Sequence, residues 1–394
     1  MSGSHRLPGG IVAYFQPIVS ADTNDIYAYE VLGRLTDGEG SVASLGPFFT
    51  DRNVSDEEAL PVDRMVRRYA MQKYVEESRT EFLFLNNRLA WLSKGADRPE
   101  TMRTAVWARE YGIAPEKIVI EITEEEFNAG GVYMNALTYY KNAGYRIALD
   151  DYGKNASNIE RLAELRPDII KVNMNYIHNS ETSYHYLESL RALASFAEAV
   201  GMEILFEGVE TRRQLDVCME IRGRYYQGYL IAPPQPSMRD ATVNRSVFAE
   251  SAAGAYAALQ EKVARLDRCR QSFDTRIESF LAANPFDVRD ADLNGYLTRL
   301  CRELSDARRV YLCDKQGIQL TCSIEKRGTE LICGEYCGKN WSWRGYFSKA
   351  LETLALGGKS CLSNSYRDFT TKEPVRTYFH AIGNDRLLFV DMCA

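Results

Sequence analysis

The residues with the clearest chemical meaning are two adjacent aspartates, Asp150 and Asp151, which follow the apolar run 147–149 and precede Gly153. Two like charges at the end of a buried strand repel each other unless a cation or a proton lies between them. A divalent metal ion resolves this repulsion, and adjacent carboxylates allow one of them to bridge two ions around an attacking hydroxide. The pair therefore predicts a metal site suited to hydrolysis of a phosphate ester.

More polar side chains stand at the ends of other apolar runs. They are Glu30, Asn86, Glu121, Lys171, Glu207 and Gln227. A single acid in such a place is usually a turn or helix-capping residue, but that explanation is poor for the whole set. Oxygen ligands without His or Cys select Mg²⁺, Mn²⁺ or Ca²⁺ rather than zinc. Arg34 and Lys171 can neutralise phosphate oxygens as charge builds on them.

The elements that would position these residues alternate between short apolar strands and helices. We expect strands at 12–19, 26–34, 82–87, 117–124, 146–150, 168–173, 202–210 and 225–230, and helices at 56–77, 98–111, 132–142, 159–165, 184–200 and 212–220. The first two strands have a turn composition between them, typical of a hairpin. The alternation predicts an α/β fold, a (β/α)8 barrel, in which the ends of the strands share one pocket.

The length, net charge, apolar runs and cysteine positions of the chain exclude some classes of protein. A chain of 394 residues is too long for one ordinary core, so two domains are expected. The net charge of -6 argues against a non-specific nucleic-acid binder. No run approaches the roughly 20 apolar residues of a membrane span, and residues 1–6 lack a signal-peptide core. All nine cysteines lie at or beyond Cys218, which predicts a cytoplasmic chain with reduced thiols and a separate C-terminal module.

Six segments, taken in order, resemble the motifs of EAL-domain proteins. They are 29–34 (Tyr-Glu-Val-Leu-Gly-Arg), 120–124, 150–153, 170–173, 206–211 and 227–229. The resemblance covers residues 11–238 and is specific because the motifs occur in order. It implies a modified TIM barrel with one antiparallel strand. It also implies hydrolysis of cyclic di-GMP to linear pGpG with Mg²⁺ or Mn²⁺, and Ca²⁺ as an ion that binds and inhibits.

The resemblance implies a role for each site residue. The metal ligands implied are Glu30, Asn86, Glu121, Asp150 and Asp151, with the two aspartates bridging to a second ion. The catalytic residues implied are Asp151, Lys171 and Glu207, of which the last two orient or deprotonate the attacking water. The residues implied in contact with the ligand are Gln16, Arg34 and Pro233. Glu210 and Gln227 are implied in ligand binding from positions behind the residues in direct contact. Glu124 corresponds to the residue that anchors the loop after the aspartate pair.

Two positions depart from the family pattern. After the aspartates the family usually runs Phe-Gly-Thr-Gly-Tyr-Ser-Ser, whereas residues 152–158 here are Tyr-Gly-Lys-Asn-Ala-Ser-Asn, without the second glycine. Asn173 stands where the family has an aspartate. Ligand binding should survive these changes better than turnover, because catalysis needs both ions placed to within a fraction of an ångström.

Three functions are compatible with these residues to different degrees. The first is a cyclic di-GMP phosphodiesterase, and the second is a receptor that binds cyclic di-GMP but hardly hydrolyses it. The third is a Schiff-base lyase or aldolase built on Lys171, which has no use for so many carboxylates.

Residues 246–283 are predicted to form a long connecting helix. Its apolar residues are spaced alternately by three and four: Tyr256, Leu259, Val263, Leu266, Phe273, Ile277 and Phe280. Such a stripe fits either a coiled coil or an amphipathic helix packed on its own domain. A homodimer is expected from the family and from this stripe.

The C-terminal module is expected to be a smaller α+β domain. We expect helices at 292–304 and 346–356 and strands at 309–313, 317–322, 375–381 and 387–392. This pattern resembles PAS or Cache-like sensor domains, and with the barrel it resembles the YkuI-type subgroup of EAL proteins. It implies an unknown small-molecule signal that regulates the barrel. Cys333 and Cys337 are expected to be buried thiols rather than a zinc or redox site.

The expected organisation of the whole chain has four parts. They are a flexible N-terminus at 1–10, an EAL barrel at 11–240, the connecting helix at 246–283 and a PAS/Cache-like sensor domain at 284–394.

Overall fold

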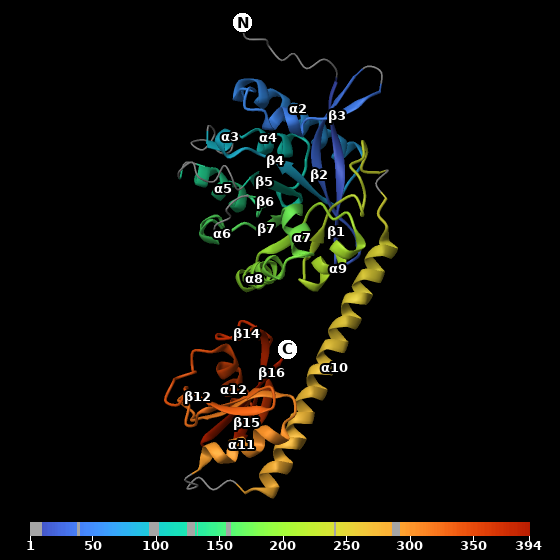
Figure 1. Ribbon diagram of the computed structural model, residues 1–394. Helices are drawn as coiled ribbons and strands as arrows, with labels where there is room; N and C mark the ends of the chain where they lie inside the picture. The colour runs from blue at the N-terminus through green and yellow to red at the C-terminus, as the bar shows by residue number, and fades with distance from the viewer. Residues whose placement is uncertain are drawn as a thin grey trace. The chain divides into compact units, whose positions relative to one another are not determined.

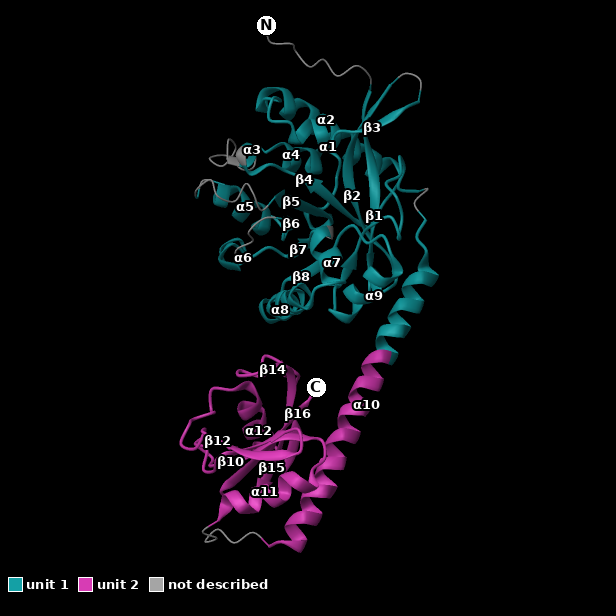
Figure 2. Cartoon of the chain, viewed as in Figure 1, with its two compact units in different colours: residues 1–257 teal, residues 258–394 magenta. Residues whose placement is uncertain are grey.

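The computed structural model describes residues 10–37, 40–93, 102–123, 131, 133–154, 159–239, 242–285 and 292–394. The chain divides into two compact units, residues 1–257 and 258–394 (Figure 2). No helix within the described ranges is long and apolar enough to span a membrane. Glu124, the expected loop anchor, lies outside these ranges.

The first unit is a closed barrel (Figure 1). Its sheet has the order β1-β9-β8-β7-β6-β5-β4-β2-β3, and a further pairing of β1 with β2 closes it. The strands are β1 (Gly10–Ser20), β2 (Asp25–Thr36), β3 (Val42–Ser44), β4 (Phe82–Asn86), β5 (Ile118–Thr123), β6 (Arg146–Tyr152), β7 (Ile169–Val172), β8 (Glu203–Phe206) and β9 (Tyr225–Tyr226). Strand β1 is antiparallel to both of its neighbours, whereas β2 and β4 to β9 run parallel. The prediction of an α/β, modified TIM barrel is confirmed.

Helices follow most of the parallel strands. They are α1 (Gly46–Thr50), α2 (Asp56–Glu76), α3 (Leu89–Ser93), α4 (Arg103–Glu110), the 3-10 turn η2 (Pro115–Lys117), α5 (Tyr133–Asn142), α6 (Ile159–Leu165), α7 (Met174–Ser180), α8 (Tyr184–Val200) and α9 (Arg212–Glu220). Helix α2 begins at a capping box in which the Ser55 hydroxyl and the Glu58 carboxylate each accept from the other's backbone N–H. It buries Ala59, Val66 and Ala70 in the core. Helix α7 was absent from the prediction.

One layer of apolar side chains fills the barrel, with one residue from each of its eight strands. The layer consists of Ile18, Ala28, Phe84, Val119, Ala148, Ile169, Leu205 and Tyr225, all essentially inaccessible to solvent. Side chains two residues apart on a strand point to the same face of the sheet. The residues two positions further along β2 and β4 to β9, and two positions earlier along the reversed strand β1, must therefore form the next layer.

The backbone at Gly228 passes very close to the backbone of Val209. A Cβ atom there would lie 2.2 Å from both the backbone N and O of Val209. We expect Gly228→Ala to destabilise the first unit by about 3 kcal/mol, at the upper end of overpacking costs. Gly254→Ala is the matched control, because a Cβ there meets nothing within 4 Å and Gly254 is helical. The control should gain about 0.5–1 kcal/mol, so calorimetric melts in which both variants shift the same way would contradict this interpretation.

The second unit is a smaller α+β domain, which confirms that part of the prediction. Its sheet has the order β12-β11-β10-β16-β15-β13, and β14 pairs with β15. Its elements are the second part of α10 (Arg245–Ala283), α11 (Leu293–Glu303), β10 (Ala307–Cys313), β11 (Ser323–Arg327), β12 (Glu330–Gly334), α12 (Gly345–Ala355), β13 (Ser360–Leu362), β14 (Tyr366–Arg367), β15 (Pro374–Ile382) and β16 (Arg386–Cys393). The strand expected at 317–322 does not form: Ile318 and Gln319 make only isolated bridges, and the next strand begins at Ser323. The PAS/Cache likeness stays a prediction.

The apolar stripe of α10 has two parts. Phe273, Ile277 and Phe280 are buried in the core of the second unit, so this part packs on its own domain. Tyr256, Leu259 and Val263 are 48–63% exposed. The coiled-coil interpretation stays open for the exposed part alone.

The expectation of reduced thiols is wrong for Cys322 and Cys333, which form a disulfide. The expectation of a buried thiol is wrong for Cys337, which is exposed. Cys322 directly precedes β11 and Cys333 lies in β12, and their Cα atoms are 5.7 Å apart, within the usual range for a disulfide. Cys333 therefore pairs across the hairpin and not with Cys337 in its own segment.

Candidate functional site

The layer above the apolar core is polar in every strand. It consists of Gln16, Glu30, Asn86, Glu121, Asp150, Lys171, Glu207 and Gln227, each two residues from its apolar counterpart in the same strand direction. Seven of them follow the apolar residue, and Gln16 precedes Ile18 because β1 runs the other way. The folded barrel thus brings together residues that are up to 211 positions apart.

Lys171 lies at the centre of this layer and is fully buried. Its Nζ lies 2.5 Å from Glu121 Oε1, 2.7 Å from Glu207 Oε1, 3.0 Å from Asp150 Oδ1 and 3.2 Å from Glu30 Oε1. Gln227 extends the network by donating to Glu30 Oε2 at 2.6 Å and to Gln16 Oε1 at 3.3 Å.

Burial and crowding shift the proton affinities of this cluster. Burial raises the pKa of Glu121 and of Glu207 well above the usual value, and it also raises the pKa of Asp150. Burial alone would lower the pKa of Lys171, but the carboxylates of Asp150, Glu121, Glu207 and Glu30 hold it well above its usual value. Lys171 therefore stays protonated and acts as a cation.

The donor set fits a hard divalent cation. Four carboxylates surround a single ammonium group, and burying such surplus negative charge is costly without a further cation. Glu121 Oε2 is buried and accepts no hydrogen bond from any described residue. Asn86 adds an amide at the level of Glu121, its partner in the β4–β5 register. Within the described ranges, no group of three or more His, Cys, Asp or Glu side chains is arranged to hold a metal ion. This agrees with the position of the Lys171 ammonium group, which lies between the four acids.

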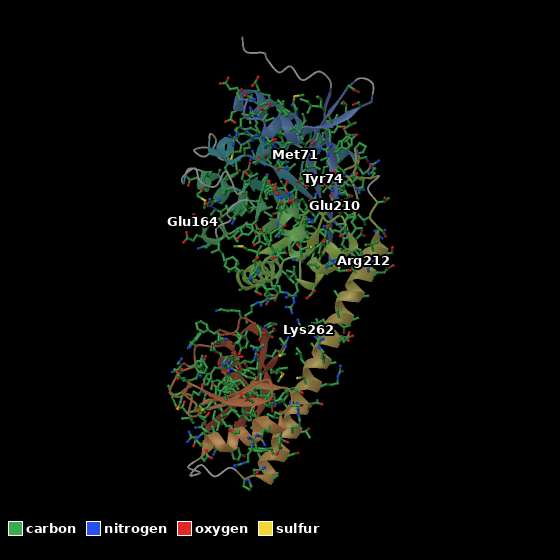
Figure 3. The ribbon with its side chains drawn as sticks, viewed as in Figure 1. Met71, Tyr74, Glu164, Glu210, Arg212 and Lys262 are labelled. Carbon is green, nitrogen blue, oxygen red and sulfur yellow. A yellow bond between two sulfur atoms is a disulfide. The ribbon has the colours of Figure 1, made fainter. Side chains whose placement is uncertain are left out.

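A cavity of about 280 Å³ opens beside this layer. It is lined by Gln16, Glu30, Leu32, Arg34, Asn173, Glu207, Gly208, Glu210, Gln227, Gly228, Tyr229 and Pro234. All of the expected ligand-binding residues except Pro233 line it; Glu210 is marked in Figure 3. Pro233 is exposed, and the next residue, Pro234, faces the cavity in its place.

The sequence interpretation did not name Tyr229, which lines the cavity. Tyr229 is 65% exposed, so its ring is available to a ligand. The signal was present, because Tyr229 belongs to the segment 227–229 that resembles a family motif.

Asp151 lies at an irregular point of the barrel. The register between β6 and β7 shifts between Leu149 and Tyr152, and Asp151 has a positive φ of 58°. Its Oδ1 accepts from Asn173 Nδ2 at 2.6 Å, and its Oδ2 pairs with Lys154 Nζ at 2.8 Å. Lys154, from the loop after the aspartate pair, and Asn173, which stands in place of the family's aspartate, thus contact the same carboxylate.

Comparison with known proteins gives matches to both units. The family model "EAL domain" matches residues 7–234, and the model "EAL-domain associated signalling protein domain" matches residues 255–394. The uncharacterized EAL-domain containing protein YkuI of Bacillus subtilis is 30% identical over 390 residues, covering 97% of this chain and 94% of YkuI. The cyclic di-GMP phosphodiesterase RocR of Pseudomonas aeruginosa is 25% identical over 232 residues, 58% of each chain.

The fold comparison agrees with the sequence matches. The crystal structure of Bacillus subtilis YkuI in complex with cyclic di-GMP and calcium superimposes with a TM-score of 0.89 at 28% identity, covering 98% of this chain and 96% of that one. The barrel, its polar layer and the domain that follows it therefore have one explanation: this chain belongs to the EAL-domain family, in the YkuI-type branch.

Proposed function

We propose that the barrel binds cyclic di-GMP in the cavity and hydrolyses it to linear pGpG with Mg²⁺ or Mn²⁺. The observation that carries the proposal is the ring of polar residues, one from each barrel strand, beside a cavity lined by Arg34 and Tyr229. RocR, named as a cyclic di-GMP phosphodiesterase, and the cyclic di-GMP complex of YkuI support the choice of ligand.

Glu30, Asn86, Glu121 and Asp150 would hold the first ion, and Asp151 would bridge to a second. A bound divalent cation polarises the phosphodiester and lowers the pKa of a coordinated water. Calcium, present in the YkuI complex, fits the same oxygen ligands.

Residues of the chain would accept the proton of the attacking water and bind the phosphate and the base. Glu207 is the candidate acceptor for the proton of the attacking water, because it lines the cavity and burial raises its pKa. Lys171, held protonated, orients Glu207 at 2.7 Å. Arg34 supplies positive charge to the phosphate, and Tyr229 offers a face on which a guanine can stack. Attack at phosphorus breaks one P–O3′ bond of the ring and leaves a 5′-phosphate.

A catalytically weak receptor remains the second candidate. It is favoured by the contacts of Asp151 with Lys154 and Asn173, which engage both oxygens of a carboxylate that turnover requires.

The second unit is proposed to sense a small molecule and regulate the barrel. A cavity of about 600 Å³ in this unit, with Arg309, Tyr336 and Lys339 in its lining, supports a ligand site there. The four-part organisation given above and a homodimeric assembly belong to the same proposal.

The test is calorimetric titration of the full chain with cyclic di-GMP, followed by incubation with Mn²⁺ and chromatography of the products. Binding with formation of pGpG supports the enzyme, binding without pGpG supports the receptor, and no binding contradicts both.

Asn173→Asp restores the family's carboxylate, and we expect it to raise turnover about tenfold or more. An unchanged rate in that variant would locate the limitation elsewhere.

We expect Tyr229→Ala to weaken cyclic di-GMP binding by about 1–3 kcal/mol, the range for loss of one base–aromatic stack. Tyr256→Ala is the control, because Tyr256 is similarly exposed, at 63%, but lies on α10. Both affinities are measured by titration calorimetry. Equal binding by the two variants would remove Tyr229 from the ligand site.

A further inference from the structure

Asp151 occupies a conformation that ordinary residues rarely adopt. Its φ of 58° lies in the left-handed region, which aspartate tolerates better than most residues but which still costs energy. The neighbouring Asp150 follows the regular alternation of β6 and points at Lys171. Adjacent side chains of a strand point to opposite faces, and Asp151 stands at the register shift between Leu149 and Tyr152, so its carboxylate has different partners from that of Asp150.

The surroundings of Asp151 are supplied by the chain itself. The Lys154 ammonium lies 2.8 Å from Oδ2, and the Asn173 amide donates to Oδ1 at 2.6 Å. Asn173 is fixed in turn, because its Oδ1 accepts from the backbone N–H of Asn175 and caps α7. Gly153 has a positive φ and lies against the ring of Tyr176 from the same helix, which holds the backbone between Asp151 and Lys154. The arrangement is therefore held by α7 and does not depend on Lys154 alone.

We propose that Lys154 is a built-in cation that takes the place of the second metal ion at Asp151. An ammonium group beside a carboxylate neutralises it without a metal, and it repels a dication that approaches the same oxygens. The barrel would then hold its ligand with one divalent ion, at the ligands around Lys171, while the second ion must displace Lys154. This inference rests on the proposed metal site and goes beyond it by naming the residue that sets the number of ions bound.

The expected size of the effect is moderate. Lys154 and Asp151 are partly exposed, at 48% and 31% of their side chains, so their ion pair is weakened by solvent. We expect removal of the ammonium group to strengthen binding of the second ion about tenfold, the lower end of the range for groups beside metal ligands.

The experiment counts Mn²⁺ ions bound to the full chain by electron paramagnetic resonance, with and without cyclic di-GMP. The wild-type chain should bind one ion tightly and a second at least tenfold more weakly. Lys154→Gln should tighten the second ion about tenfold, whereas Lys154→Arg should not. Lys262→Gln is the matched control, since it removes the same charge from an exposed position on α10 (Figure 3).

Two equivalent ions in the wild-type chain would overturn the inference without the use of any variant. An unchanged affinity for the second Mn²⁺ ion in a folded Lys154→Gln chain would also overturn it. So would an equal increase of that affinity in Lys262→Gln. Failure of the proposed function looks different, because cyclic di-GMP would then not bind while the dependence of Mn²⁺ stoichiometry on Lys154 persisted. Tight cyclic di-GMP binding together with two equivalent ions would sink this inference alone.

Discussion

Replacement of Lys171 by methionine is expected to destabilise the first unit by about 3–5 kcal/mol, the usual cost of leaving buried charges without their partner. Lys171 is fully buried, and its ammonium group contacts Glu30, Glu121, Asp150 and Glu207. Methionine fills a similar volume, so the loss measures charge rather than packing. Four carboxylates without a cation must take up protons or bind metal. We therefore expect millimolar Ca²⁺ to stabilise the variant more than it stabilises the wild-type chain.

Hydrogen exchange with mass spectrometry is the suitable measurement, because peptides from β5 to β8 report on the barrel separately from the second unit. Lys262→Met serves as the control, since Lys262 is exposed on α10. Exchange in β5 to β8 that matches the wild-type chain without Ca²⁺ would show that Lys171 is not the cation that balances the cluster.

Most of the polar layer was predictable from the sequence because strand geometry is regular. Seven of its eight residues stand two positions after an apolar one, so apolar runs that end in an acid, an amide or a lysine identify them. Gln16 lies within the reversed strand β1 and came only from the family resemblance. Asp151 breaks that regularity, and its contact with Asn173 depends on how β6 bulges against β7. A single sequence carries no direct signal for that bulge.

The elements that the sequence interpretation missed have local causes. Helix α7 has seven residues and depends on a side-chain cap from Asn173, so it has little periodicity to detect. The edge strand β12 and its neighbour β11 carry Glu325, Lys326, Arg327 and Glu330, so they lack the apolar alternation that identifies a strand. These charges concealed the hairpin and, with it, the disulfide between Cys322 and Cys333.

Replacement of Arg309 by methionine should have the corresponding effect in the second unit. The Arg309 guanidinium lies 2.9 Å from Asp368, 3.0 Å from Glu325 and 3.1 Å from Asp391, and it joins β10 to β11, β16 and the segment before β15. Burial alone would lower its pKa, but Asp391, Asp368 and Glu325 hold it above the usual value. Because Asp391 is buried, we expect a loss of about 3–5 kcal/mol in the variant.

The pKa values of Asp368 and Asp391 determine in which direction the stability loss of Arg309→Met changes with pH. In the wild-type chain, burial tends to raise the pKa of Asp368, but the Thr371 backbone N–H and Arg309 hold it below its usual value. Its contribution to stability is therefore present above the unfolded pKa, near 3.9, and is lost as the pH falls further. Without Arg309, burial should raise the pKa of Asp391 further than it does now. A folded state that binds more protons than the unfolded state gains stability as the pH falls.

The deficit of Arg309→Met should therefore shrink between pH 7 and pH 5, as measured by hydrogen exchange in β10, β15 and β16. Arg309→Lys should recover only part of the loss, because one ammonium group cannot contact three carboxylates in the way that a guanidinium fork does. Arg327→Met is the control, since the Arg327 side chain is 72% exposed and lies 3.8 Å from Glu325. A deficit that stays constant across this pH range would mean that Arg309 stabilises the sheet by packing, with the charges of Asp368 and Asp391 compensated by other groups.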